Sequence, residues 1–130
     1  MSLNNTKRVL NLDMRNIQMT NKIAQKFDTQ KNRLELVDPI SIEGLAAVLT
    51  FGAQKYAADN WRNGLEYSRL IGAMKRHLSA FEKGEDIDPE SGLPHIDHLG
   101  CCWMFLSNFT KTRPELDNRW YTKEKHNESK

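Results

Sequence analysis

The stretch HLGCCWMFLSNF, residues 98–109, is apolar at most positions over about three helical turns. A helix that is hydrophobic on nearly every side is buried at the centre of a bundle or in an interface. Pro94 lies just upstream, and proline is favoured at the start of a helix. The stretch therefore predicts a central helix, opened by Pro94, against which other helices pack.

Two segments upstream have the helical period and recognisable ends. Asp38-Pro39 is a favourable helix start, and apolar residues then recur at helical spacing until about Tyr56. In the second segment Ser68 is a candidate cap, and Gly84 lies where helices commonly end. No segment alternates with the two-residue period of a strand. We therefore predict an all-α fold, a bundle of antiparallel helices.

The length of 130 residues suits one domain with a buried core. Residues 1–25 show no firm periodicity and are predicted to form an N-terminal arm. Residues 26–110 form the predicted helical domain, and residues 111–130 a polar C-terminal tail. In that tail Trp120 and Tyr121 are the only large side chains that can dock on the body or on another subunit.

Composition excludes several classes of function. The net charge is +2 with both signs interspersed, so the concentrated basic face of a nucleic-acid-binding protein is not expected. No run of eighteen apolar residues indicates a membrane span, and the N-terminus lacks the apolar centre of a signal peptide. We therefore expect a cytoplasmic protein. The adjacent Cys101 and Cys102 point about 100° apart on a helix, which favours buried, reduced thiols over a disulfide.

Between the second and third predicted helices, the stretch GEDIDPESGLPHIDH, residues 84–98, holds five carboxylates and two histidines. His95 and His98 share a helix face, and His77 can approach them if the two helices pair antiparallel. Mixed nitrogen and oxygen ligands suit manganese, iron, cobalt or zinc, whereas carboxylates alone suit magnesium. The candidate ligands of a divalent metal are His77, Glu85, Asp86, Asp88, Glu90, His95 and His98.

Plainer interpretations apply to the same residues. Acidic residues between helices are often solvated, and a helical histidine such as His77 is often a hydrogen-bonded core residue. A calcium loop fits only in part, because Ser91 replaces its glycine and Asp97 replaces its final glutamate. We place Asp97 outside the ligand set, near the site or in solvent.

A second group of residues, centred on FGAQKYAADNWRNG at 51–64, suits a nucleotide. Cations neutralise phosphates, flat aromatic rings stack on a base, and an amide offers both a donor and an acceptor to a base edge. Core packing of the aromatics and a solvated surface for the cations remain alternatives. No glycine-rich phosphate loop and no Ser-His-Asp arrangement is present. The candidate substrate-binding residues are Lys31, Arg33, Lys55, Tyr56, Asn60, Trp61, Arg62 and Arg69.

Three stretches carry a family resemblance: KFDTQKNRLELVDP (26–39), LTFGAQKYAADNWRNG (49–64) and SRLIGAMKRHLSAFEKGEDIDPESGLPHIDHLGCC (68–102). They resemble the phage dATP/dGTP diphosphohydrolases of the MazZ type, compact relatives of the MazG-like all-α nucleoside triphosphate pyrophosphatases. The resemblance implies hydrolysis of purine deoxynucleoside triphosphates to monophosphate and pyrophosphate. It also implies a magnesium or manganese cofactor, a homo-oligomer (dimer or tetramer) that completes the bundle, and, for a phage protein, the host cytoplasm.

The resemblance also implies roles for individual residues. The Glu-x-x-Asp metal pair of the classical MazG-like enzymes falls on His95 and His98, so the metal set differs from theirs. For metal-assisted hydrolysis, our own candidates for the base that takes a proton from water are Glu85 and Glu90, with equal standing. Alternatives are a His-Asp-type metal phosphohydrolase, although Asp97-His98 reverses the usual order, and a nucleotide-binding regulator or structural module without turnover.

Overall fold

The computed structural model describes residues 23–123. The α-helices whose bounds lie in this range are α2 (Pro39–Lys55), α3 (Tyr67–Glu82) and α4 (His95–Thr112). Short 3-10 helices are η1 (Leu34–Leu36), η2 (Asn60–Asn63) and η3 (Pro114–Leu116). Among the described residues no strand forms, and an isolated bridge joins Ile87 to Pro94. The predicted all-α fold is confirmed, and no helix within residues 23–123 is long and apolar enough to cross a membrane.

The chain divides into two compact units, residues 1–34 and residues 35–130. Most of the predicted N-terminal arm, residues 1–22, lies outside the described range. The described residues of the first unit, 23–34, are all exposed and include a turn in which Lys31 N donates to Asp28 O (3.0 Å). Helices α2, α3 and α4 all belong to the second unit.

Helix α2 begins as the sequence predicts. The Asp38 carboxylate accepts hydrogen bonds from Ser41 N (2.9 Å) and Ser41 Oγ (3.0 Å), which satisfies a free amide of the first turn. Pro39 occupies the first helical position, where no amide hydrogen is needed. The helix ends at Lys55, so both predicted ends are confirmed.

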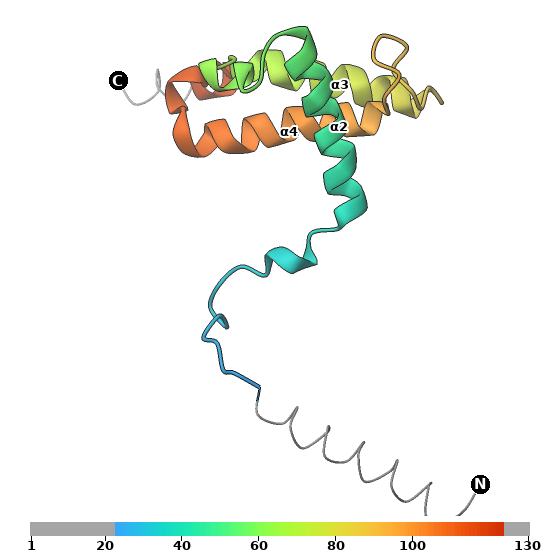
Figure 1. The fold of residues 1–130 in the computed structure, drawn as a ribbon. Coiled ribbons are helices and arrows are strands. Elements are labelled where there is room, and N and C mark those ends of the chain that lie inside the picture. The colour runs from blue at the N-terminus through green and yellow to red at the C-terminus, as the bar shows by residue number, and fades with distance from the viewer. Residues whose placement is uncertain (1–22, 124–130) are drawn as a thin grey trace, which may run out of the picture. The chain divides into compact units, whose positions relative to one another are not determined.

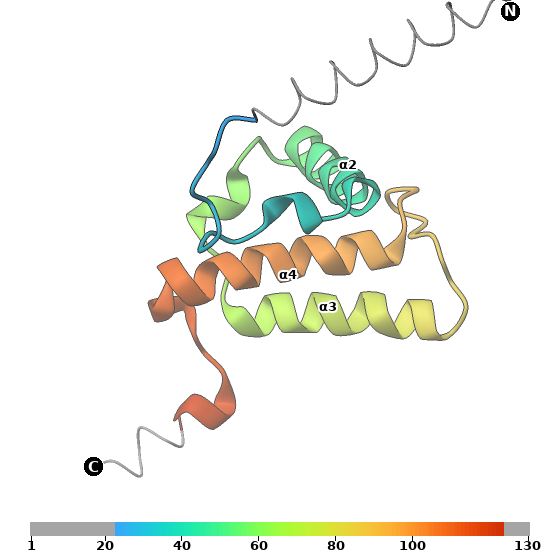
Figure 2. The same ribbon diagram turned by 90° about the horizontal axis from the view of Figure 1, so that it is seen from below.

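Helices α3 and α4 form an antiparallel pair, and α2 crosses α4 (Figures 1 and 2). The core between α3 and α4 contains the buried side chains of Tyr67, Leu70 and Phe109. The Tyr67 hydroxyl donates to Phe109 O at 2.8 Å, which gives this buried polar group a partner. Partly buried side chains pack around that core: Trp61, Leu65, Cys102, Phe105, Leu106 and Leu116.

Helix α4 is therefore the central helix that its sequence predicts. Pro94 is its N-cap, and Cys101 and Phe109 are among its buried residues. One side of α4 remains open, because Ile96 and Trp103 are 45% and 58% exposed. The two cysteines are free, as expected, with Cys101 buried and Cys102 half-buried.

The predicted cap of α3 is wrong. The helix begins at Tyr67, which places Ser68 inside the first turn, and Glu66 at the N-cap makes no side-chain cap bond. The cap comes from Asn118, whose Oδ1 accepts from Ser68 N at 3.0 Å. Its Nδ2 donates to Glu66 Oε2 (2.6 Å) and Ser68 Oγ (2.7 Å). A residue fifty positions downstream therefore fixes the start of α3.

The segment after α4 packs on the body through residues other than those predicted. Leu116 packs against the core, and Tyr67 Oη donates to Arg113 O at 3.1 Å. Trp120 and Tyr121 remain 63% and 76% exposed. Arg113 Nη1 donates to Arg62 O at 3.3 Å, so this segment supports the η2 loop.

Gly44 allows the close crossing of α2 and α4. A Cβ atom at Gly44 would lie 2.6 Å from Asp97 Oδ2, far inside van der Waals contact. The Asp97 carboxylate therefore faces the α2 backbone, consistent with its predicted place outside the ligand set.

Candidate active site

The acidic loop between α3 and α4, residues 83–94, is held in a defined turn. Gly84 and Gly92 have φ values of 91° and 73°, which glycine adopts readily. Asp88 N donates to Leu93 O (2.9 Å), and Gly92 N donates to Asp88 O (2.8 Å). This closed turn directs Asp88, which is only 16% exposed at its side chain, toward the adjoining helices.

Three histidines meet beside this loop. His77 comes from α3, and His95 and His98 come from the first turn of α4. The rings of His77 and His98 stack in parallel, with centroids 4.8 Å apart and an interplanar angle of 7°. The Nδ1 atoms of His77 and His95 are 2.8 Å apart, a hydrogen-bond distance. The antiparallel pairing of α3 and α4 therefore produces the convergence that the sequence predicted.

Among the described residues, one group satisfies the spacing of a metal site: His77, Asp88 and His98. One donor atom from each lies within 4.8 Å of the others. Two imidazole nitrogens and a carboxylate oxygen form a donor set for manganese, iron, cobalt or zinc. Burial, followed by the charges of His98 and His95, lowers the pKa of His77. The neutral imidazole is favoured, which is the form that binds a metal.

The other predicted ligands lie around this group without joining it. Glu85 Oε2 is 3.5 Å from His95 Nε2, and Glu90 pairs with Lys55 Nζ at 2.6 Å. Asp86 contributes its backbone carbonyl to His95 N at 2.9 Å, while the residue itself is exposed. The structure thus gathers three of the seven candidate ligands into one group.

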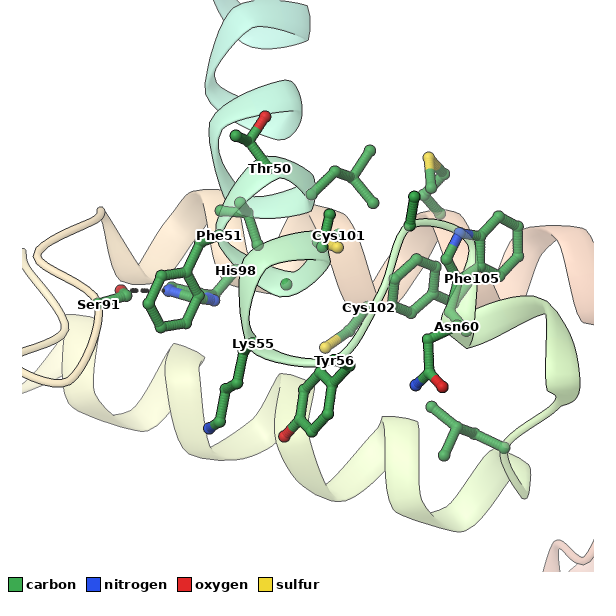
Figure 3. A pocket seen from close by; sticks show the side chains of 18 of the residues that line it. Thr50, Phe51, Lys55, Tyr56, Asn60, Ser91, His98, Cys101, Cys102 and Phe105 are labelled. Carbon is green, nitrogen blue, oxygen red and sulfur yellow. Dashed lines mark hydrogen bonds between the residues drawn. The ribbon is translucent and has the colours of Figure 1, made fainter.

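A cavity of about 890 Å³ is lined by the three candidate metal ligands, His77, Asp88 and His98. Figure 3 shows His98 and Ser91 on one side of it, Asn60 and Phe105 on the other, and Lys55 and Tyr56 between them. Ligand pockets in proteins are commonly of this size. One cavity therefore joins the metal-ligand group to the predicted nucleotide-binding residues of segment 51–64.

The predicted cations divide into two sets. Lys55 and Arg62 line the cavity. The hydrogen bond from Lys55 to Glu90 raises the pKa of Lys55, so the amine stays charged at neutral pH. Arg62 Nε donates to Asp59 Oδ1 at 2.9 Å. Arg69 is exposed on α3 and is not among the cavity residues, whereas Lys31 and Arg33 belong to the first unit.

Trp61 and Tyr56 have different environments. The Trp61 ring stacks on Phe105, with centroids 4.6 Å apart and an angle of 15°, and Arg62 lies 4.4 Å from its centroid. These contacts make Trp61 a packing residue of the cavity wall. Tyr56 is 66% exposed at the mouth of the cavity, so its ring is the one available to stack on a ligand.

Sequence reasoning missed two residues that contact the histidines. Ser91 Oγ is 2.6 Å from His98 Nε2, although Ser91 was not among the predicted site residues. Phe51 packs edge-on against His98, with ring centroids 6.4 Å apart. The position of Ser91 between the candidate ligands Glu90 and His95 was the available signal. The sequence gives no such signal for Phe51, because an aromatic residue on an apolar helix indicates ordinary packing.

Comparisons with known proteins identify the family of this sequence. Residues 21–119 match the sequence model of a family described as dATP/dGTP diphosphohydrolase, N-terminal. A dATP/dGTP diphosphohydrolase of Salmonella phage PMBT28 is 44% identical over 94 residues, which is 72% of this chain and 32% of the relative. The chain thus spans about a third of the length of that relative. No solved structure matches the chain. The family match covers most of the chain, and the protein therefore belongs to the dATP/dGTP diphosphohydrolase family.

Proposed function

We propose that this chain hydrolyses purine deoxynucleoside triphosphates between the α and β phosphates, releasing the monophosphate and pyrophosphate. The observation that carries the proposal is the single cavity that joins His77, Asp88 and His98 to Tyr56 and Asn60. The substrate class is supported by the name of the phage relative, a dATP/dGTP diphosphohydrolase.

His77, Asp88 and His98 would hold a divalent metal. Their nitrogen and oxygen donors fit manganese better than magnesium, which prefers oxygen ligands and keeps several waters. A metal bound there supplies Lewis acidity toward phosphate oxygens and lowers the pKa of a coordinated water.

Other residues of the cavity bind the phosphates and the base of the substrate. Lys55 and Arg62 bind the phosphates, and Lys55 exchanges its exposed ion pair with Glu90 for a phosphate oxygen. Tyr56 stacks on the base, and the Asn60 amide contacts the base edge. The proposal assigns no contact to Lys31, Arg33 or Arg69.

The reaction forms one bond and breaks one. A water oxygen attacks the α-phosphorus, and the bridging oxygen leaves with pyrophosphate. Glu90 accepts the proton of the water, because Glu90 lines the cavity and Glu85 is not among its lining residues. Positive charge on Lys55 and Arg62 stabilises the departing pyrophosphate.

We also propose that the chain acts as a homo-oligomer. Among the described residues of the second unit, large apolar side chains remain exposed on α2 and α4, including Ile40, Ile42, Ile96 and Trp103. A second copy of the chain is the occupant with matching apolar surface. Full burial of a large apolar side chain contributes roughly 1.5–3 kcal/mol relative to full exposure, so burial of this surface would stabilise the assembly.

The experiment that tests the proposed function is incubation with each ribo- and deoxynucleoside triphosphate in manganese, followed by separation of the products. The expected result is monophosphate and pyrophosphate from dATP and dGTP. Release of inorganic triphosphate would identify the His-Asp-type reaction instead. Tight binding without any product would identify a regulator. Asp88→Asn, which replaces a proposed carboxylate ligand with a neutral amide, should abolish turnover.

A further inference from the structure

We propose that His95 is a positioning residue that fixes the tautomer of His77 and so presents His77 Nε2 to the metal. In this arrangement Glu85 orients His95. The inference rests on the proposed metal site, and it removes His95 and Glu85 from the set of direct ligands.

Four polar atoms lie in a row whose central residue, His95, is buried. His95 is 6% exposed, and its Nδ1 is 2.8 Å from His77 Nδ1. Its Nε2 is buried and makes no hydrogen bond, and Glu85 Oε2 lies 3.5 Å away. The atoms therefore follow the order Glu85 Oε2, His95 Nε2, His95 Nδ1, His77 Nδ1.

Electrostatics and hydrogen bonding select the protonation along this chain. A lone pair on His95 Nε2 would face a carboxylate and be repelled, whereas an N–H there is attracted to it. With the proton on Nε2, the neutral His95 ring has an acceptor at Nδ1. His77 must then donate from Nδ1, because two nitrogens 2.8 Å apart need one donor and one acceptor. His77 Nε2 is left as the lone pair available to a cation.

A direct ligand role for His95 is less consistent with the geometry. Its Nδ1 already faces His77, and its Nε2 faces Glu85 rather than Asp88 or His98. Within residues 23–123 the group that meets ligand spacing contains neither His95 nor Glu85. A histidine ligand commonly donates its second ring nitrogen to such a partner, and loss of the partner weakens metal affinity 10–100-fold.

Two substitutions of His95 distinguish a residue that positions His77 from a residue that binds the metal directly. In His95→Asn the amide oxygen replaces Nδ1 as an acceptor, while the Nε2 position is lost. In His95→Leu both the acceptor at the Nδ1 position and the nitrogen at the Nε2 position are lost. Manganese affinity is measured by electron paramagnetic resonance for both variants and for His98→Asn, the same change at a proposed ligand. Circular dichroism and thermal unfolding confirm that each variant is folded.

The expected result is manganese affinity within a few-fold of wild type for His95→Asn and a 10–100-fold loss for His95→Leu. His98→Asn should lose the site. In the metal-free wild type, ¹⁵N NMR should show His77 as the Nδ1–H tautomer, and His95→Leu should lose that signature.

Three results would overturn the proposal: equal loss in His95→Asn and His95→Leu, no loss in either, or His77 as the Nε2–H tautomer. If wild type binds no divalent metal, the metal site and the proposed mechanism fail together. A protein that binds manganese without hydrolysis leaves the role of His95 intact and contradicts the proposed function alone. The tautomer measurement needs neither metal nor substrate, so it reports on His95 in every case.

Discussion

At the scale of single residues, the position of Glu90 makes it, rather than Glu85, the base that we propose. Glu90 lines the cavity, while Glu85 lies next to His95. We expect Glu90→Gln to lower kcat by about 10²–10⁴-fold, because a general base contributes that much. Nucleotide binding, measured by calorimetry, should persist. The matched control is Glu85→Gln, whose amide oxygen can take the place of the carboxylate oxygen that faces His95 Nε2. A larger loss of turnover in Glu85→Gln than in Glu90→Gln would contradict this assignment.

The two thiols permit a prediction of pH dependence. Burial raises the pKa of Cys101 to about 12, and burial also raises the pKa of Cys102. A raised pKa keeps both as unreactive thiols near neutral pH, and the thiolate forms only as the pH rises toward that value. Iodoacetamide should therefore label the native protein slowly at neutral pH and rapidly after unfolding in guanidinium. Rapid labelling of the native protein at neutral pH would show that the thiols are accessible.

The histidines show what sequence can and cannot predict about single residues. His77 was expected to approach His95 and His98 if the two helices paired antiparallel, and in the structure it lies against both. Residues three apart share a helix face, so spacing alone did not separate His98, which belongs to the candidate metal-ligand group, from His95, which lies at hydrogen-bond distance from His77. The rotation of α4 against α3 determines which of the two histidines joins Asp88 and which joins His77 alone. This rotation depends on packing over the whole length of both helices.

At the scale of elements, the Asn118 side chain caps the N-terminus of α3. We expect Asn118→Ala to lower the free energy of unfolding by about 1–2 kcal/mol, because loss of an N-cap side chain costs about that much. Chemical denaturation measures the change. Asn63→Ala, at an exposed position of η2, is the control and should change stability by less than about 0.5 kcal/mol. Equal effects of the two substitutions would argue against the cap.

The same cap explains why one helix end was predicted correctly and another was not. Asp38 and Pro39 act on the helix that follows them directly, so a local pattern suffices. The cap of α3 comes from a residue fifty positions away, and Ser68 was the best local candidate. Local signals cannot reveal a cap that forms only after the C-terminal segment has packed. For a similar reason Trp61 could not be assigned until Phe105 was seen against its ring.

At the scale of the whole molecule, the exposed apolar surface predicts self-association. Ile42 lies on α2 and is 47% exposed. We expect the wild type to behave as a dimer or tetramer in size-exclusion chromatography with light scattering. Ile42→Lys should shift it toward the monomer, because a charge in an apolar interface is costly. Gln54→Lys, at an exposed polar position of the same helix, should not. A wild type that remains monomeric at all concentrations would contradict the proposed assembly.

The central claim is that water attacks the α-phosphorus of a purine deoxynucleoside triphosphate in this cavity. Hydrolysis of dGTP or dATP in ¹⁸O-labelled water with manganese, followed by mass spectrometry of both products, tests it most directly. We expect one ¹⁸O atom in the deoxynucleoside monophosphate and none in pyrophosphate. Label in pyrophosphate, or the absence of these two products, would contradict it.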